Sequence, residues 1–180
     1  MTFNRRLFLK TAGFTAAGLI TSQLPLSSAH AVQKKPANAQ SIMGLVVPKM
    51  DTVRVGFIGV GQRGSGHVKH FCHIDGVEIK AICDIDQQVL DKSIAFIDAQ
   101  GLPKPAQYTG SEHAYKALLS RDDIDIVIIS TPWEWHAPMA IHTMESGKHA
   151  FVEVPLALTV EECWQIVDTA ERTQKNCMMM

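Results

Sequence analysis

The feature that most constrains the fold of this chain is a glycine-rich turn that follows a β-rich run, Val53–Ile58. The turn reads Gly59-Val60-Gly61-Gln62-Arg63-Gly64. In such a GxGxxG turn the first glycine permits a tight bend, the second lets the backbone approach a pyrophosphate, and the third lets the next helix pack closely on the strand. That helix directs free N–H groups and its positive dipole end at the phosphates. Because the motif stands between a strand and a helix, it predicts a dinucleotide site.

An acidic residue stands where a dinucleotide site needs one. Asp84 follows a second alternating run, Val77–Cys83, about twenty residues beyond Gly64. A carboxylate at this strand end hydrogen-bonds the adenosine ribose hydroxyls and repels a 2′-phosphate, so we expect NAD rather than NADP. Asp86 is the alternative ribose ligand, but its place before a helical pattern favours an N-cap role.

Strand and helix patterns alternate along the remainder of the chain. Ile124–Ser130 is the most hydrophobic strand pattern, as expected of a central strand buried on both faces. Strands alternating with helices predict an α/β fold, a Rossmann-type doubly wound parallel sheet with right-handed crossovers. The other expected elements are helices over Ser65–His73, Asp86–Ala99, Ser111–Ser120, Ala137–Glu145 and Thr159–Thr173, and strands over Tyr108–Thr109, His149–Glu153 and Cys177–Met180.

The N-terminal residues have the pattern of an export signal. Arg5 and Arg6 precede a weakly apolar stretch, residues 11–24, and the small-residue pattern Ala29-His30-Ala31 follows. Paired arginines are typical of the twin-arginine type, and we expect cleavage after Ala31. The apolar stretch is too short and too polar to be a good membrane-spanning helix.

Three segments follow from this pattern. We predict a signal peptide over residues 1–31, a polar linker over 32–50 and an NAD-binding domain over 51–180. The mature protein would then be periplasmic or secreted, with no membrane attachment after the signal is removed. The alternative is a cytoplasmic protein with an arginine-rich tail.

Composition excludes several other classes of protein. The 180 residues carry a net charge of -1, which gives no electrostatic reason to expect nucleic acid or a charged membrane as partner. Four scattered cysteines have neither disulfide-scaffold nor zinc-site spacing. His67, His70 and His73 recur every three residues, but they drift around a helix and lack further ligands, so we predict no metal.

Two turns are expected at the edge where the parallel strands end. Thr131-Pro132-Trp133-Glu134-Trp135-His136 follows one predicted strand and Glu153-Val154-Pro155 follows the next. Ligands of doubly wound sheets lie outside the carboxyl ends of the strands, so both turns are well placed to contact the cofactor. Trp133 and Trp135 could alternatively cap the sheet as core aromatics, although their place in a loop favours a cofactor wall.

These motifs together resemble the Gfo/Idh/MocA oxidoreductase family. The resemblance rests on the GxGxxG turn, Asp84, the Thr-Pro-x-x-x-His turn and the Glu-x-Pro turn, and it covers Val53 to Met180. There are two departures: Trp133 stands where the family commonly has asparagine, and Val154 stands where it has a lysine near the nicotinamide. The missing lysine disfavours ordinary alcohol dehydrogenation.

The combination of Trp133-Glu134-Trp135-His136, Glu153-Val154-Pro155 and a twin-arginine leader is similar to glycoside hydrolase family 109, the NAD-dependent α-N-acetylgalactosaminidases. That resemblance implies hydrolysis by transient oxidation of the sugar's C3 hydroxyl, elimination of the aglycone, addition of water and re-reduction. It implies a glycoside of α-linked N-acetylgalactosamine as substrate and leaves a homo-oligomer open. Together, the glycine motif and this resemblance give the predicted cofactor-binding residues: Gly59, Gly61, Gln62, Arg63, Gly64, Asp84, Trp133, Glu134, Trp135, His136, Glu153 and Val154.

No catalytic residue can be named by this resemblance. The family's substrate-binding and acid/base residues are expected beyond Met180, in a C-terminal α+β substrate domain that we expect this chain to lack. Two other functions therefore stay open. One is a Gfo/Idh/MocA sugar dehydrogenase with net hydride transfer, and the other is an inactive NAD-binding fragment.

Overall fold

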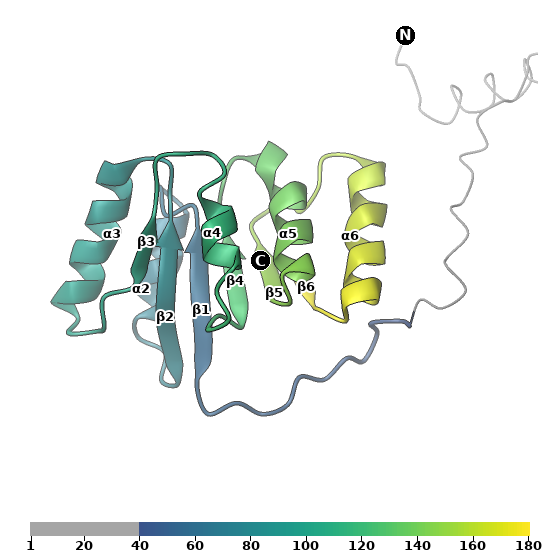
Figure 1. Ribbon diagram of the computed structural model, residues 1–180, viewed down its shortest axis with the longest axis horizontal. Helices are drawn as coiled ribbons and strands as arrows, with labels where there is room; N and C mark the ends of the chain where they lie inside the picture. The colour runs from purple at the N-terminus through teal and green to yellow at the C-terminus, as the bar shows by residue number, and fades with distance from the viewer. Residues whose placement is uncertain (1–39) are drawn as a thin grey trace, which may run out of the picture. The chain divides into compact units, whose positions relative to one another are not determined.

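The computed structural model describes residues 40–180, which form a parallel sheet of six strands with helices on both faces (Figure 1). The sheet order is β3-β2-β1-β4-β5-β6, and every neighbouring pair is parallel. The predicted doubly wound Rossmann fold is confirmed. The strands are β1 (Val53–Ile58), β2 (Val77–Cys83), β3 (Ala106–Tyr108), β4 (Ile126–Ile129), β5 (His149–Val152) and β6 (Cys177–Met179). The helices are α2 (Gly64–Phe71), α3 (Gln87–Ala99), α4 (Tyr115–Leu119), the 3₁₀ turn η1 (Trp133–Trp135), α5 (His136–Glu145) and α6 (Val160–Thr173).

The strand order reverses between β1 and β4. The chain builds outward from β1 through β2 to β3, then returns to β1's other side and builds outward through β4, β5 and β6. At such a switch point the connections leave in opposite directions, which opens a crevice where the strands end. We call this edge of the sheet the carboxyl edge. Both predicted cofactor turns and the glycine-rich turn leave the sheet there.

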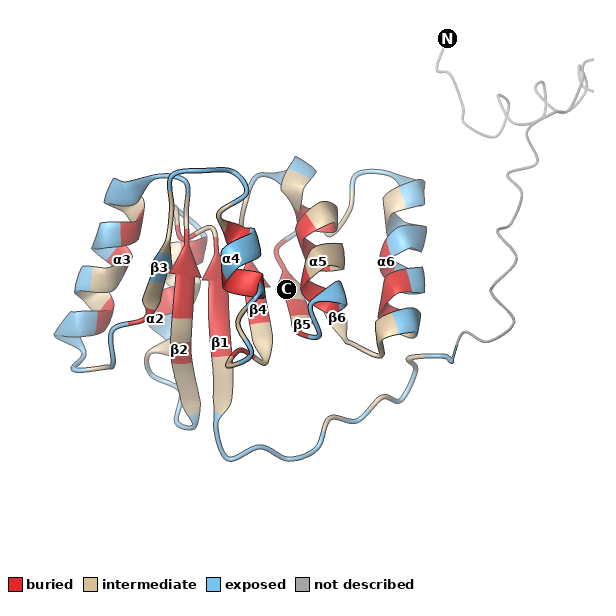
Figure 2. Ribbon diagram, in the orientation of Figure 1, coloured by how far each residue is buried: buried red, intermediate tan, exposed pale blue. Residues whose placement is uncertain are grey.

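The two faces of the sheet carry separate apolar cores. Buried residues follow the central strands (Figure 2). One core packs α2 and α3 on the sheet, and the other packs α4, α5 and α6 on the opposite face. Alternate residues of β4 serve the two cores: Ile128 belongs to the first, whereas Val127 and Ile129 belong to the second. A strand buried on both sides must be apolar at every position, which explains the unbroken run in the sequence.

Two predicted helix starts are confirmed by their caps. The Asp86 side chain accepts hydrogen bonds from the backbone N–H groups of Gln88 and Val89, so this residue is the N-cap of α3. Thr159 and Glu162 form a reciprocal capping box at the start of α6. Each arrangement satisfies N–H groups that the first helical turn leaves unpaired.

Some predicted boundaries are wrong. The helix expected over Ser111–Ser120 is confined to α4, because residues 111–114 form turns of the i→i+3 type instead. The strand expected over Ile124–Ser130 is confined to β4, although the backbone N–H groups of Asp125 and Ser130 still donate to carbonyl groups of β1. These differences shorten elements without changing the topology.

The predicted signal peptide and most of the predicted linker lie outside the described residues. Residues 40–52 contain no helix or strand, but Ile42 packs against the core of α4, α5 and α6, and Gln174 donates to the Gln40 carbonyl. Among the helices of residues 40–180, none has the length and apolar character needed to cross a membrane.

Candidate functional site

The glycine-rich turn, residues 59–64, is shaped by two close backbone approaches. Gly59 has φ +80°, and a Cβ there would lie 2.7 Å from the Ser130 carbonyl oxygen. A Cβ at Gly64 would collide with the Gly59 carbonyl oxygen. A Cβ at Gly61, in contrast, would meet nothing within 4 Å. The first and third glycines are therefore required by the protein itself, while the second faces open space of the kind a pyrophosphate needs.

The start of α2 is electrostatically suited to an anion. The backbone N–H groups of Gln62 and Arg63 donate to no group among residues 40–180. Arg63 is the N-cap of α2 without a side-chain cap bond, and the first turn of the helix contains no acidic residue. Unpaired N–H groups at a helix N-terminus attract negative charge. No acceptor among the described residues occupies these N–H groups, so they are available to an anion.

Asp84 lies half-buried at the end of β2 and holds the glycine-rich turn. One carboxylate oxygen accepts from the Val60 backbone N–H at 2.8 Å, and the other accepts from the Asp86 N–H at 3.0 Å. An ionised carboxylate has about four acceptor positions, so these two bonds leave capacity for ribose hydroxyls. Contact between Asp84 and a ribose stays a prediction.

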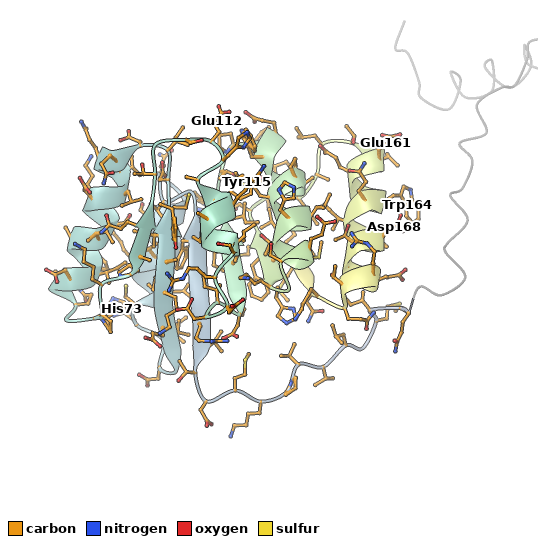
Figure 3. All side chains as sticks on the ribbon, in the orientation of Figure 1. His73, Glu112, Tyr115, Glu161, Trp164 and Asp168 are labelled. Atoms are coloured by element: carbon orange, nitrogen blue, oxygen red, sulfur yellow. The ribbon has the colours of Figure 1, made fainter. Side chains whose placement is uncertain are left out.

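The two tryptophans of the turn after β4 have different surroundings. Trp133 is 62% exposed, whereas Trp135 is half-buried with its ring edge-on to His113 and Tyr115, at 6.0 and 6.5 Å between centroids. Figure 3 shows Tyr115 on α4, where its hydroxyl lies 2.7 Å from Nδ1 of His142 on α5. Trp133 thus fits the cofactor-wall interpretation, and Trp135 fits the core interpretation. Glu134, between them, is exposed.

The His136 side chain is buried between two turns of the carboxyl edge. The residue is 1% exposed, with Nδ1 at 2.7 Å from the Pro155 carbonyl oxygen and Nε2 at 2.8 Å from the Thr131 carbonyl oxygen. The ring lies between the turn after β4 and the turn after β5, and contact between His136 and NAD stays a prediction. A ring N–H of His136 can satisfy one of these carbonyl groups at the start of α5.

Glu153 forms a cluster that sequence reasoning missed. Its Oε1 accepts from Nε of Arg63 at 3.0 Å and contacts Nε2 of His67 at 2.6 Å, while Oε2 accepts from the Val154 N–H at 3.2 Å. Burial raises the pKa of Glu153, but the bonds from His67, Val154 and Arg63 together outweigh it and hold the pKa below its ordinary value. The available signal was the four-residue spacing of Arg63 and His67, which places both on one helix face.

His70, on α2, and His73, just beyond the end of that helix, do not join this cluster. His70 and His73 are exposed, and Figure 3 places His73 toward the opposite end of α2 from the carboxyl edge. No group of three or more potential metal ligands occurs within the described part of the chain.

A cavity of about 400 Å³ opens beside the glycine-rich turn, between α2 and α3. Its lining shares Gly61 and Gln62 with the predicted site but includes neither Asp84 nor either nicotinamide-side turn. The cavity therefore lies next to the expected path of the dinucleotide rather than along it.

Fold and site together define a dinucleotide-binding Rossmann protein. The residues fit NAD, because the space at Gly61, the unpaired N–H groups and Asp84 lie along one edge. The chain belongs to the Gfo/Idh/MocA family: residues 53–180 match the family model described as "Oxidoreductase family, NAD-binding Rossmann fold". Its cofactor is NAD.

Named relatives are much longer than this chain. It is 86% identical, over all 180 residues, to a "Glycosyl hydrolase family 109 protein" of Shewanella pealeana, and spans 40% of that protein. It is 67% identical to an "Alpha-N-acetylgalactosaminidase" of Shewanella oneidensis over 178 residues, which are 98% of this chain and 39% of that protein.

A solved structure with a similar fold carries NADH. The WlbA dehydrogenase of Chromobacterium violaceum, in complex with NADH and UDP-GlcNAcA, superposes with a TM-score of 0.63 at 27% identity. The match covers 76% of this chain and 37% of that one. This likeness supports the Rossmann fold and the family's use of NAD.

Proposed function

We propose that this chain is the NAD-binding part of a glycosidase that hydrolyses α-linked N-acetylgalactosamine. The observation that carries the proposal is Val154, an aliphatic side chain that is 55% exposed at the carboxyl end of β5. Dehydrogenation of an alcohol needs a group that helps to remove the hydroxyl proton, and a valine side chain cannot do so. The relatives named as glycosidases support the same conclusion.

Bound NAD would supply a reversible oxidation of the sugar's C3 hydroxyl to a ketone, which acidifies the C2 proton so that the C1 aglycone leaves by elimination and water adds in its place. This net hydrolysis does not require the two opposed carboxylates of ordinary glycosidases. Within residues 40–180 we assign no acid or base to the sugar.

The residues of this chain would bind and orient. The N–H groups of Gln62 and Arg63 would hold the pyrophosphate, and Asp84 would hold the adenosine ribose. Trp133 and Val154 would shield the nicotinamide end from water, because both present exposed apolar surface at the carboxyl edge. His136 would keep the two turns that carry them in fixed relation.

We further propose that the protein is exported, folded and loaded, by the twin-arginine route and released by cleavage after Ala31. Hydrolysis that regenerates its own cofactor suits a compartment with little free NAD. The paired Arg5 and Arg6 in the sequence support this proposal.

A chimera tests the proposed activity. This chain would replace the corresponding residues of the Shewanella pealeana relative, so that the remainder of that protein supplies the other side of the site. We expect release of p-nitrophenol from the p-nitrophenyl α-glycoside of N-acetylgalactosamine without net accumulation of NADH. The relative itself is the matched control.

Two other outcomes would select the alternatives. Stoichiometric NADH together with an oxidised sugar would identify a sugar dehydrogenase, the function that the WlbA likeness favours. Binding of NAD by the chimera with neither reaction, while the relative is active, would leave this chain as a cofactor-binding module only.

A further inference from the structure

One oxygen of Glu153 contacts two side chains at the start of α2. Glu153 is 8% exposed and follows β5, while its two side-chain partners, Arg63 and His67, belong to the N-cap and second turn of α2. Because an ionised carboxylate only accepts hydrogen bonds, Nε2 of His67 carries the hydrogen in the 2.6 Å contact. The cluster therefore ties the start of α2 to the nicotinamide-side turn.

Arg63 is anchored at one atom and free at its outer end. Its Nε lies 3.0 Å from Glu153, yet its side chain is 77% exposed, and neither Nη atom has a partner within residues 40–180. A cation at a helix N-terminus opposes the helix dipole. An arginine in this position is favourable when an anion is shared between its outer N–H groups and the helix.

We propose that His67 and Glu153 are positioning residues that hold the outer N–H groups of Arg63 toward the pyrophosphate of NAD. The inference rests on the proposed placement of the dinucleotide across the glycine-rich turn. His67 does not contact the cofactor in this arrangement and acts through Glu153.

The need for His67 follows from the exposure of Arg63. An ion pair with one solvated partner contributes little and does not fix geometry by itself. The short bond from His67, whose side chain is 21% exposed, holds Oε1 in place so that the exposed guanidinium has a fixed acceptor. Three N–H donors on one carboxylate also limit the rotations open to Glu153.

The test compares ligands that share different parts of NAD. Calorimetry on the 180-residue chain would measure dissociation constants for NAD, ADP-ribose and adenosine with H67L and with the matched control H70L, an exposed histidine of the same helix. We expect H67L to weaken NAD and ADP-ribose about tenfold, the effect of losing one hydrogen bond to a charged group. Adenosine and all H70L constants should stay within about twofold of wild type.

Two further variants separate positioning from general damage. H67Q retains an N–H donor of similar reach and should recover most of the lost affinity. In an R63M background, H67L should cause no further loss, because the group it positions is already gone. Thermal unfolding of each variant, without ligand, identifies any that fail to fold.

Several outcomes overturn the inference. These are equal affinity of H67L and wild type for ADP-ribose, a loss confined to NAD, or a full additional loss in the R63M background. A loss confined to NAD would show that Glu153 acts on the nicotinamide end directly. The proposed glycosidase activity is judged separately by the chimera, so either idea can fail while the other stands.

Discussion

The carboxylate of Asp84, at the end of β2, accepts a 2.8 Å hydrogen bond from the backbone N–H of Val60, inside the glycine-rich turn. The residue expected to bind the ribose therefore also fixes the turn expected to bind the pyrophosphate. Two neighbouring strands, β1 and β2, are coupled in this way before any ligand arrives, which reduces the ordering that binding must cost.

Because Asp84 has two roles, its substitution should lower both the affinity for NAD and the preference for NAD over NADP. We expect D84N to weaken NAD binding about tenfold, because a hydrogen bond to a charged acceptor is lost, and to narrow the preference for NAD over NADP, because the repulsion of a 2′-phosphate is gone. Calorimetry with both cofactors measures this. D86N is the control, since asparagine caps helices as well as aspartate does. An unchanged preference in D84N would contradict the assignment.

The glycines of the turn should separate folding from binding. G64A places a Cβ against the Gly59 carbonyl and should reduce the free energy of unfolding by about 3 kcal/mol. G61A meets no protein atom, so its stability should stay within about 0.5 kcal/mol of wild type while NAD binding is lost. Urea denaturation and calorimetry on the same samples give both quantities. Normal NAD affinity in G61A would show that the pyrophosphate does not approach there.

The two tryptophans should also have separate effects: one substitution should lower stability and the other should weaken NAD binding. W135L removes a half-buried ring that lies edge-on to His113 and Tyr115 and should cost about 2 kcal/mol of stability. W133L changes an exposed ring, so stability should hold while NAD binds about threefold more weakly. Unfolding curves and titrations of both variants decide this. If W133L binds NAD as tightly as wild type, Trp133 is not a wall of the cofactor site.

The contrast between these tryptophans shows which information the sequence contains. The order of strands and helices, the caps at Asp86 and Thr159, and the glycine-rich turn were predictable because each depends on residues close together in the chain. The partial burial of Trp135 could not be predicted, because it depends on α4 packing beside η1. Likewise, the burial of His136 depends on two carbonyl groups that different turns bring together.

The opposite edge of the sheet offers a test of pH dependence away from the site. Hydrogen bonds from Arg54 hold the pKa of Asp125 below its ordinary value of 3.8, outweighing the opposing effect of burial. A depressed carboxyl pKa contributes stability that is present above the ordinary value and is lost as the pH falls through the lower folded value. D125N should therefore cost about 1 kcal/mol near neutral pH, and the difference from wild type should shrink below pH 3.8.

Urea denaturation from about pH 7 to about pH 3 measures this difference. D75N, at an exposed position, is the matched control and should follow the wild-type curve throughout. A constant difference between D125N and wild type across this range would contradict the role given to the Arg54 pair.

Export can be tested through the two residues that define the signal. Twin-arginine recognition depends on the arginine pair rather than on charge alone, so R5K/R6K should keep the protein in the cytoplasm although its net charge is unchanged. Cell fractionation followed by mass spectrometry of the N-terminus measures location and cleavage together, with K34R/K35R in the predicted linker as the charge-matched control. We expect the control to be exported and to begin at Val32. Export of the R5K/R6K variant at the wild-type level, or a mature N-terminus far from Val32, would contradict the proposed signal.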